Sequence, residues 1–157
     1  MKFALLAVVV VGIAGGLAIP TGHPAAVAPA LAAPADTPVA TVIDRAASGH
    51  FLTVADVNKE PIRFVVDTGA DIVALTQEDA RRAHVAFDPD NFTVIGRGAS
   101  GPVRGEEVRI DSIVLDGKRA SDVHGVVLEQ SDMSLLGQSY LRHIDSVQIK
   151  GDTMTLR

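Results

Sequence analysis

Apolar positions divide the chain into one long apolar segment at the N-terminus and a series of short apolar runs after residue 41. The short runs are rich in β-branched and aromatic residues and are bounded by turn-forming residues, a combination that is typical of strands. Close spacing of many short strands predicts an all-β domain with the architecture of a small barrel or a sandwich. The runs cover residues 50–57, 61–66, 72–75, 123–129, 146–150 and 153–157, with two more strands within 92–115 around a glycine-rich tip.

Turn residues join several of these strands. Asn58-Lys59-Glu60 is a hairpin-sized gap between the first two strands. Pro61 suits the first residue of the second strand, where a missing N–H costs little. Asp116-Gly117 is a favoured two-residue hairpin turn, and Gly151-Asp152 joins the last two strands. These turns support the β interpretation of residues 41–157.

Helical signals are confined to two short segments. Residues 76–83, TQEDARRA, begin with Thr76 and carry Asp79 three residues later, which is the acidic form of a capping box. Acidic residues also suit the positive N-terminal end of a helix. The LLG sequence at 135–137 leads into QSYLRHI, residues 138–144, which is expected to form one or two helical turns. The domain is therefore predicted to contain one or two short helices.

The N-terminal segment has the order of a secretory signal. Lys2 is followed by uncharged residues 3–19 and then by small residues and prolines, with Ala30-Leu31-Ala32 as a small-x-small cleavage site before Ala33. Residues 3–19 are also just long enough to serve as an uncleaved membrane anchor. Residues 1–32 are thus predicted to be a signal peptide or a membrane anchor. Both alternatives place the domain outside the cytoplasm, where it would be periplasmic, secreted or associated with the membrane through residues 3–19.

The remaining domain organisation is simple. A buried helix within residues 1–32 is disfavoured because no polar positions mark a solvent-facing side. Residues 33–40 are rich in proline and alanine and are expected to form an extended linker. Residues 41–157 then form one domain, as the chain length of 157 residues predicts.

Composition excludes several kinds of chemistry. The net charge is −5, with both signs mixed through the domain, which argues against nucleic acid as the main partner because phosphate binding needs a clustered basic surface. The chain has no cysteine, so it has no disulfide, thiol nucleophile or cysteine-ligated zinc. Its histidines show no metal-ligand spacing and are expected to be surface or turn residues. We therefore predict no metal and no organic cofactor.

Asp67 is the candidate for chemistry, because it follows the apolar run FVV and is followed by Thr68 and Gly69. A carboxylate at the end of a buried strand is costly unless it is hydrogen-bonded. Gly69 permits a tight turn whose backbone N–H groups could hold that carboxylate, and a fixed carboxylate can act as a general base toward water. The same three residues are also ordinary turn chemistry. Taken alone, the motif is equally compatible with a catalytic site and with a simple turn.

Three elements in order resemble those of retropepsin-like aspartic proteases. The segment Val65-Val66-Asp67-Thr68-Gly69-Ala70 resembles their active-site segment, and residues 134–141, SLLGQSYL, resemble their apolar-apolar-Gly segment and following helix. The glycine-rich hairpin from Arg97 to Gly105 stands where that family has its flap. The resemblance covers residues 41–157 and is closest to the bacterial secreted or membrane-anchored members. It implies that the all-β domain is a small closed barrel.

The resemblance also implies a role for individual residues. Asp67 would be catalytic, Thr68 would orient the two catalytic loops, and Gly69 and Ala70 would support them. A flap over the substrate would contain Gly98, Ala99, Ser100 and Gly101, and the segment behind the site would contain Leu135, Leu136 and Gly137.

A single Asp-Thr-Gly motif has a consequence for assembly. Proteases of this type need two carboxylates around one water, and two such close charges share one proton. Asp71 lies beyond the turn, so the resemblance implies a homodimer in which Asp67 of each subunit faces its mate. The predicted function is hydrolysis of peptide bonds in peptide or protein substrates. The alternatives are a non-catalytic peptide- or partner-binding module on the same fold and, less favoured, a monomeric structural domain.

Overall fold

The computed structural model describes residues 37–98 and 101–157. The predicted signal peptide or anchor, its cleavage site and residues 33–36 of the predicted linker lie outside the described residues. Within the part of the chain that is described, no helix is long and apolar enough to cross a membrane.

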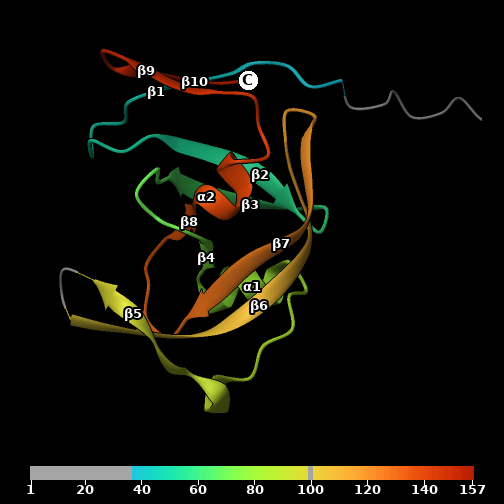
Figure 1. Ribbon diagram of the computed structural model, residues 1–157, viewed down its shortest axis with the longest axis vertical. Coiled ribbons are helices and arrows are strands. Elements are labelled where there is room, and N and C mark those ends of the chain that lie inside the picture. Colours follow the sequence, from blue (N-terminus) through green and yellow to red (C-terminus); the bar gives the residue numbers. More distant parts are fainter. Residues whose placement is uncertain (1–36, 99–100) are drawn as a thin grey trace, which may run out of the picture. The chain divides into compact units, whose positions relative to one another are not determined.

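The described residues form β-structure with two short α-helices and one 3-10 turn (Figure 1). The strands are β1 (Thr41–Asp44), β2 (Leu52–Val57), β3 (Glu60–Val66), β4 (Val73–Leu75), β5 (Thr93–Gly98), β6 (Gly101–Leu115), β7 (Lys118–Leu128), β8 (Ser134–Leu136), β9 (Val147–Lys150) and β10 (Thr153–Leu156). The helices are α1 (Gln77–Arg82) and α2 (Gln138–Leu141), and the 3-10 turn η1 spans Pro89–Asn91. Thr76 caps α1 as predicted, since its Oγ1 accepts a hydrogen bond from the Asp79 N–H at 3.0 Å.

Six strands close into a barrel. The main sheet has the order β2-β3-β8-β4-β7-β6-β5, and β2 also pairs with β6 through Asp56↔Val114 and Val57↔Ile113. That second pairing joins the two sides of the sheet and leaves β5 as an extension of β6. The predicted all-β class with a small closed barrel and two short helices is confirmed.

Parallel pairings in the middle of the barrel set the position of the loop between β3 and β4. β8 runs parallel to β3, with Val66 opposite Leu136, and also pairs with β4 through Ala74 and Leu135. β4 in turn runs parallel to β7. The loop that leaves β3 therefore lies directly against the end of β8 and the start of α2.

The core is filled by the inward-facing side chains of these strands and of α2. Their burial removes apolar surface from water, which is the main favourable contribution to folding. Tyr140 on α2 is fully buried and its hydroxyl donates to the Lys118 carbonyl at 2.8 Å. Burial raises the pKa of Tyr140, so it stays neutral and serves as a donor. The largest fully buried side chains besides Tyr140 include Phe64, Ile62, Leu75, Ile110, Ile113, Leu115, Leu136, Met154 and Leu156.

A second sheet, with the order β1-β10-β9, joins the two ends of the domain. β1 was not among the strands expected from the sequence, because the four-residue run TVID becomes a strand only by pairing with β10. Lys118 also holds this end of the chain, since its buried ammonium donates to the Val39 carbonyl and to Thr41 Oγ1. Burial lowers the pKa of Lys118, while Asp116 acts in the opposite direction.

Among the strand boundaries that differ from the expectation, two are set by tight turns. The turn between β2 and β3 consists of Asn58 and Lys59 alone, both with positive φ, so the strand begins at Glu60 and Pro61 is its second residue. β7 begins at Lys118, immediately after the Asp116-Gly117 turn and well before Val123. A two-residue turn requires its neighbours to pair at once, and this requirement overrides the polar character of residues 118–122.

Candidate active site

Asp67 follows directly after the buried C-terminal end of β3. Phe64 is fully buried, Val65 and Val66 are nearly so, and all three pair with β8. The first peptide group beyond the strand is also fixed, because the Asp67 N–H donates to the Leu136 carbonyl at 3.1 Å. The Asp67 side chain is half-buried. The barrel therefore holds the backbone of Asp67 in place, while the carboxylate is accessible from one side.

The turn that follows holds one of the two carboxylate oxygens. The Gly69 N–H donates to Asp67 Oδ1 at 2.9 Å, and the Ala70 N–H donates to the Asp67 carbonyl at 3.3 Å. Asp67 Oδ2 has no hydrogen-bond partner among the described residues. Thr68 is exposed, and its hydroxyl likewise has no partner within the described ranges. One oxygen is thus fixed in place while the other remains free for a ligand.

Gly137 lets the segment behind this turn approach it closely. A Cβ at Gly137 would lie 2.2 Å from the Ile72 carbonyl oxygen and 2.8 Å from that of Ala70. This close approach lets the next residue, Gln138, form two hydrogen bonds to the turn. Its N–H donates to the Ala70 carbonyl at 2.8 Å, and its Nε2 donates to the Thr68 carbonyl at 2.9 Å. Leu136 is fully buried, and its carbonyl accepts the Asp67 N–H.

Two buried serines hold the ends of β4, and their role was not recognised from the sequence. Ser139 Oγ accepts from the Val73 N–H at 2.8 Å, and Ser134 Oγ accepts from the Thr76 N–H at 3.1 Å. The Ser134 hydroxyl in turn donates to the Asp79 carboxylate at 2.6 Å. The loop carrying Asp67 is therefore fixed at its far end by side chains from β8 and α2. The only sequence signal was the position of both serines beside LLG.

Ser139→Ala is expected to lower the free energy of unfolding by about 1–3 kcal/mol, because it leaves the buried Val73 N–H without an acceptor. Chemical denaturation measures the loss, and hydrogen exchange should show faster exchange at Val73. Ser146→Ala, at an exposed serine, is the matched control and should change stability by less than about 0.5 kcal/mol. Equal stabilities of the two variants would contradict the assigned role.

Asp67 opens into a hollow of about 400 Å³, here called the Asp67 hollow. Its walls combine apolar side chains with two further titratable groups, His50 and Asp132. His50 and the segment 131–133 come from parts of the chain that no motif connects to Asp67, so no sequence pattern predicted their place in the site. Asp71 is exposed and does not line the hollow. The lining residues are His50, Val65, Val66, Asp67, Ser131, Asp132, Met133 and Leu135.

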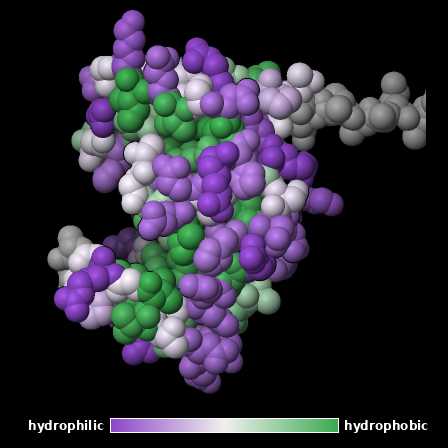
Figure 2. Space-filling view, viewed as in Figure 1, coloured by the Kyte–Doolittle hydropathy of each residue, from purple (hydrophilic) through white to green (hydrophobic). Residues whose placement is uncertain are grey.

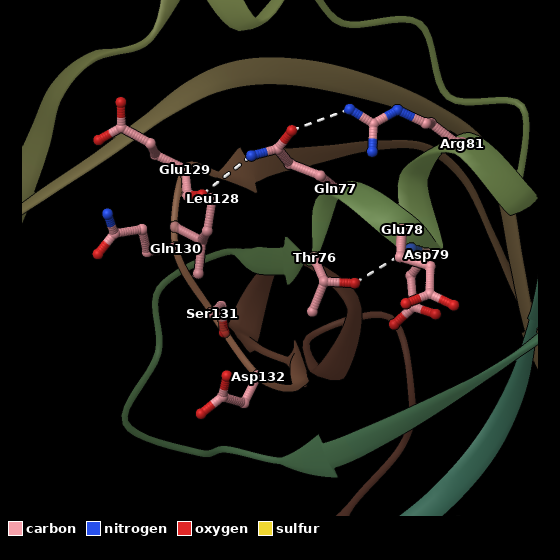
Figure 3. A pocket seen from close by; sticks show the side chains of 10 residues that line it. All are labelled: Thr76, Gln77, Glu78, Asp79, Arg81, Leu128, Glu129, Gln130, Ser131 and Asp132. Carbon is pink, nitrogen blue, oxygen red and sulfur yellow. Dashed lines mark hydrogen bonds between the residues drawn. The ribbon is translucent and has the colours of Figure 1, made fainter.

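A larger hollow of about 870 Å³ lies beside α1 and does not include Asp67 (Figure 3). We call it the α1 hollow. Figure 3 shows Ser131 and Asp132 across it from Thr76 and the start of α1. Gln77 spans its upper side, since its Nε2 donates to the Glu129 carbonyl at 2.9 Å and its Oε1 accepts from Arg81 at 2.9 Å. The α1 hollow shares Ser131 and Asp132 with the Asp67 hollow, so the two are neighbours along one segment.

The predicted flap corresponds to the hairpin of β5 and β6, which extends away from the barrel in Figure 1. Gly98 and Gly101 pair at its end, whereas Ala99 and Ser100 lie outside the described residues. Figure 2 shows the surface indented between this hairpin and the rest of the barrel. A hollow of about 410 Å³ there is lined by the hairpin and by residues 128–130.

The base of this hairpin is tied to residues 128–130 by Arg104. The Glu129 N–H donates to the Arg104 carbonyl at 2.9 Å, and Arg104 Nε lies 3.3 Å from a Glu129 carboxylate oxygen. A second Arg104 nitrogen donates to the Phe92 carbonyl at 2.7 Å. These contacts fix the base of the hairpin against residues 128–130.

No group of three potential metal ligands comes together within residues 37–98 and 101–157. His84 is exposed and has a positive φ. His124 lies on the β6–β7 hairpin, with its Nε2 at 3.4 Å from a Glu107 carboxylate oxygen. Nothing in the described site thus indicates a resident metal.

Comparison with known proteins finds a family profile and relatives that match more than half of this chain. A family profile described as "gag-polyprotein putative aspartyl protease" matches residues 53–143, more than half of the chain, including Asp67 and the LLG segment. An uncharacterised protein of a Sinorhizobium species is 34% identical over 123 residues, 74% of this chain. An uncharacterised protein of Rickettsia prowazekii is 34% identical over 116 residues, 73% of this chain. The matched regions are 51% and 50% of those proteins, so the chain spans about half the length of these curated relatives.

Solved structures show the same fold. A retropepsin-like aspartic protease from Rickettsia conorii superposes with a TM-score of 0.62 at 34% identity, covering 75% of this chain and 89% of that one. The EIAV protease in complex with the inhibitor HBY-793 has a TM-score of 0.50 at 21% identity, covering 59% of this chain and 86% of the other. The second match supports the fold alone.

Proposed function

The chain belongs to the retropepsin-like aspartic protease family, and on this basis we propose that it is an aspartic endopeptidase that acts as a homodimer. The observation that carries the proposal is the state of Asp67. Its Oδ1 is held by the Gly69 N–H, its Oδ2 has no partner among the described residues, and it opens into a hollow whose walls are partly apolar. A fixed carboxylate with one free oxygen is suited to activating water.

The chemistry requires two such carboxylates around one water. One carboxylate is ionised and takes a proton from the water, whose oxygen attacks the peptide carbonyl carbon. The other is protonated and gives its proton to the carbonyl oxygen, which is possible because two close carboxyl groups share one proton. The tetrahedral intermediate then collapses. The first carboxyl gives the proton that it took from water to the peptide nitrogen, a hydroxyl of the intermediate returns a proton to the second carboxylate, and the C–N bond breaks.

A second copy of the chain is the source that we propose for the second carboxylate. Isologous contact at a two-fold axis brings the same residue of both copies together. Thr68 supports this arrangement, because its hydroxyl is exposed beside Asp67 and has no partner within the described residues, so it can bond to the other catalytic loop. Asp71 is a poorer candidate, since it does not line the Asp67 hollow.

We propose that the substrate is a peptide or protein segment bound in extended form between the β5–β6 hairpin and the Asp67 hollow. The apolar part of that hollow, formed by Val65, Met133 and Leu135, fits an apolar substrate side chain. We also propose that the enzyme works outside the cytoplasm, on the strength of the apolar segment 3–19. No cofactor is needed for this chemistry.

The dependence of activity on protein concentration tests the proposal. If each active site needs two copies of Asp67, cleavage per mole of chain should rise with concentration and level off where sedimentation shows complete dimerisation. Constant specific activity of a chain that remains monomeric would contradict the shared site. Absence of cleavage across a mixed peptide library, from acid to neutral pH and with dimer present, would instead favour a peptide-binding module.

A further inference from the structure

Asp132 stands on the wall that the Asp67 hollow and the α1 hollow share. Its position is set by a local turn, because the Ser131 hydroxyl donates to the Met133 carbonyl at 2.7 Å and accepts from the Met133 N–H at 3.4 Å. This turn directs residues 132 and 133 outward. Asp132 is exposed and forms no hydrogen bond or ion pair with any described residue.

Two of the other charged side chains around the α1 hollow have ion-pair partners. Asp79 pairs with Arg82 at 2.7 Å, and Glu129 pairs with Arg104 at 3.3 Å. The Arg81 guanidinium donates to Gln77 and lies 5.1 Å from the centre of the Phe87 ring. Glu78 and Asp132 are the carboxylates of this hollow that have no ion-pair partner among the described residues, and of the two only Asp132 also lines the Asp67 hollow.

A substrate in the Asp67 hollow would pass this carboxylate. Successive side chains of an extended peptide alternate in direction and advance by about 3.3 Å per residue. A residue close to the cleaved bond would therefore present its side chain to Asp132, and a lysine or arginine side chain is long enough to continue into the polar α1 hollow. An acidic side chain at the same position would meet a like charge.

We propose that Asp132 is a specificity-determining residue that makes the enzyme prefer peptides with a lysine or arginine beside the residues at the cleaved bond. This inference rests on the proposed function and names the substrate class of that site. The expected preference is modest, because a partly solvated ion pair contributes little. A lysine peptide should exceed the matching glutamate peptide about tenfold in kcat/KM, which corresponds to about 1.4 kcal/mol.

Matched peptides test the proposal. Peptides that differ only by lysine, glutamine or glutamate, introduced at one flanking position after another, are cleaved by the full-length chain and its variants. At one position, wild type should show the tenfold preference, Asp132→Asn should show nearly equal rates, and Asp132→Lys should prefer glutamate. The preference is read as the lysine-to-glutamate ratio within each variant, so that a general change in activity cancels. Asp111→Asn, which removes an exposed charge that lines none of these hollows, should keep the wild-type preference.

Binding measurements separate this inference from the proposed function. The same peptides are titrated against the Asp67→Asn chain, with and without Asp132→Asn, by fluorescence anisotropy. A lysine preference in binding that disappears with Asp132→Asn supports the inference even if wild type cleaves nothing. An unchanged lysine-to-glutamate ratio in Asp132→Asn would overturn it. Loss of cleavage of the glutamine peptide in Asp132→Asn would also overturn it, because Asp132 would then belong to the chemistry.

Discussion

Asp67→Asn is expected to reduce kcat/KM for peptide cleavage by about a thousandfold or more and to leave the fold unchanged. An amide can neither take a proton from water nor share one with a second carboxylate, so the general acid and base are both lost. The turn should survive, because the side-chain oxygen of asparagine can still accept from the Gly69 N–H that now bonds to Asp67 Oδ1. Initial rates with a fluorogenic peptide measure the loss.

Controls for this variant need to separate chemistry from folding. The thermal unfolding of Asp67→Asn should match that of wild type, since Asp67 is only half-buried and its N–H bond to the Leu136 carbonyl is untouched. Asp111→Asn makes the same change in charge on the outer side of β6 and should retain full activity. Comparable rates for Asp67→Asn and wild type would refute the role of Asp67 in catalysis.

Gly137→Ala is the second change with a large expected effect, here on stability. The added Cβ would lie 2.2 Å from the Ile72 carbonyl oxygen, a contact with backbone that no rotamer change can relieve. Either the Asp67 loop or the start of α2 must move, and the Gln138 bonds to Ala70 and Thr68 would be broken or stretched. We expect a loss of about 3 kcal/mol or more in the free energy of unfolding, together with loss of activity.

Gly96→Ala is the matched control for this substitution. Gly96 lies on β5, has no positive φ, and a Cβ there would meet nothing within 4 Å. Its stability should stay within about 0.5 kcal/mol of wild type, as for most surface changes. Chemical denaturation of both variants provides the comparison. A Gly137→Ala chain as stable as Gly96→Ala would show that the close approach behind the Asp67 loop is not required.

The parts of the fold that the sequence predicted well are those that local patterns determine. β2, β3 and the β9–β10 pair are alternating or apolar runs bounded by turn residues, and α1 begins at a capping residue. β1 was missed because it depends on pairing with β10, at the other end of the domain. The first half of β7 was missed because it is polar and is fixed by the Asp116-Gly117 turn rather than by its own composition.

The candidate site likewise contains residues that the local sequence predicts and residues that only the folded chain brings together. Asp67, Thr68 and Gly69 are adjacent in sequence, so the turn that holds the carboxylate could be predicted from them. His50 and Asp132 reach the Asp67 hollow only because β2 and β8 both flank β3, an arrangement that no local pattern encodes. Ser134 and Ser139 flank the LLG segment, and their bonds to the ends of β4 follow from the parallel pairing of β3 with β8.

Heterodimers of wild type and Asp67→Asn give the most direct test of the central claim, that two copies of Asp67 form one active site. Chains carrying two different affinity tags are combined and the mixed dimer is isolated by successive purification on both tags. Cleavage of a fluorogenic peptide is then compared among the three dimers. The shared site predicts that the mixed dimer is as inactive as the Asp67→Asn homodimer, because one carboxylate cannot serve as both acid and base. A mixed dimer with about half the wild-type activity would contradict it, since each subunit would then hold a complete site.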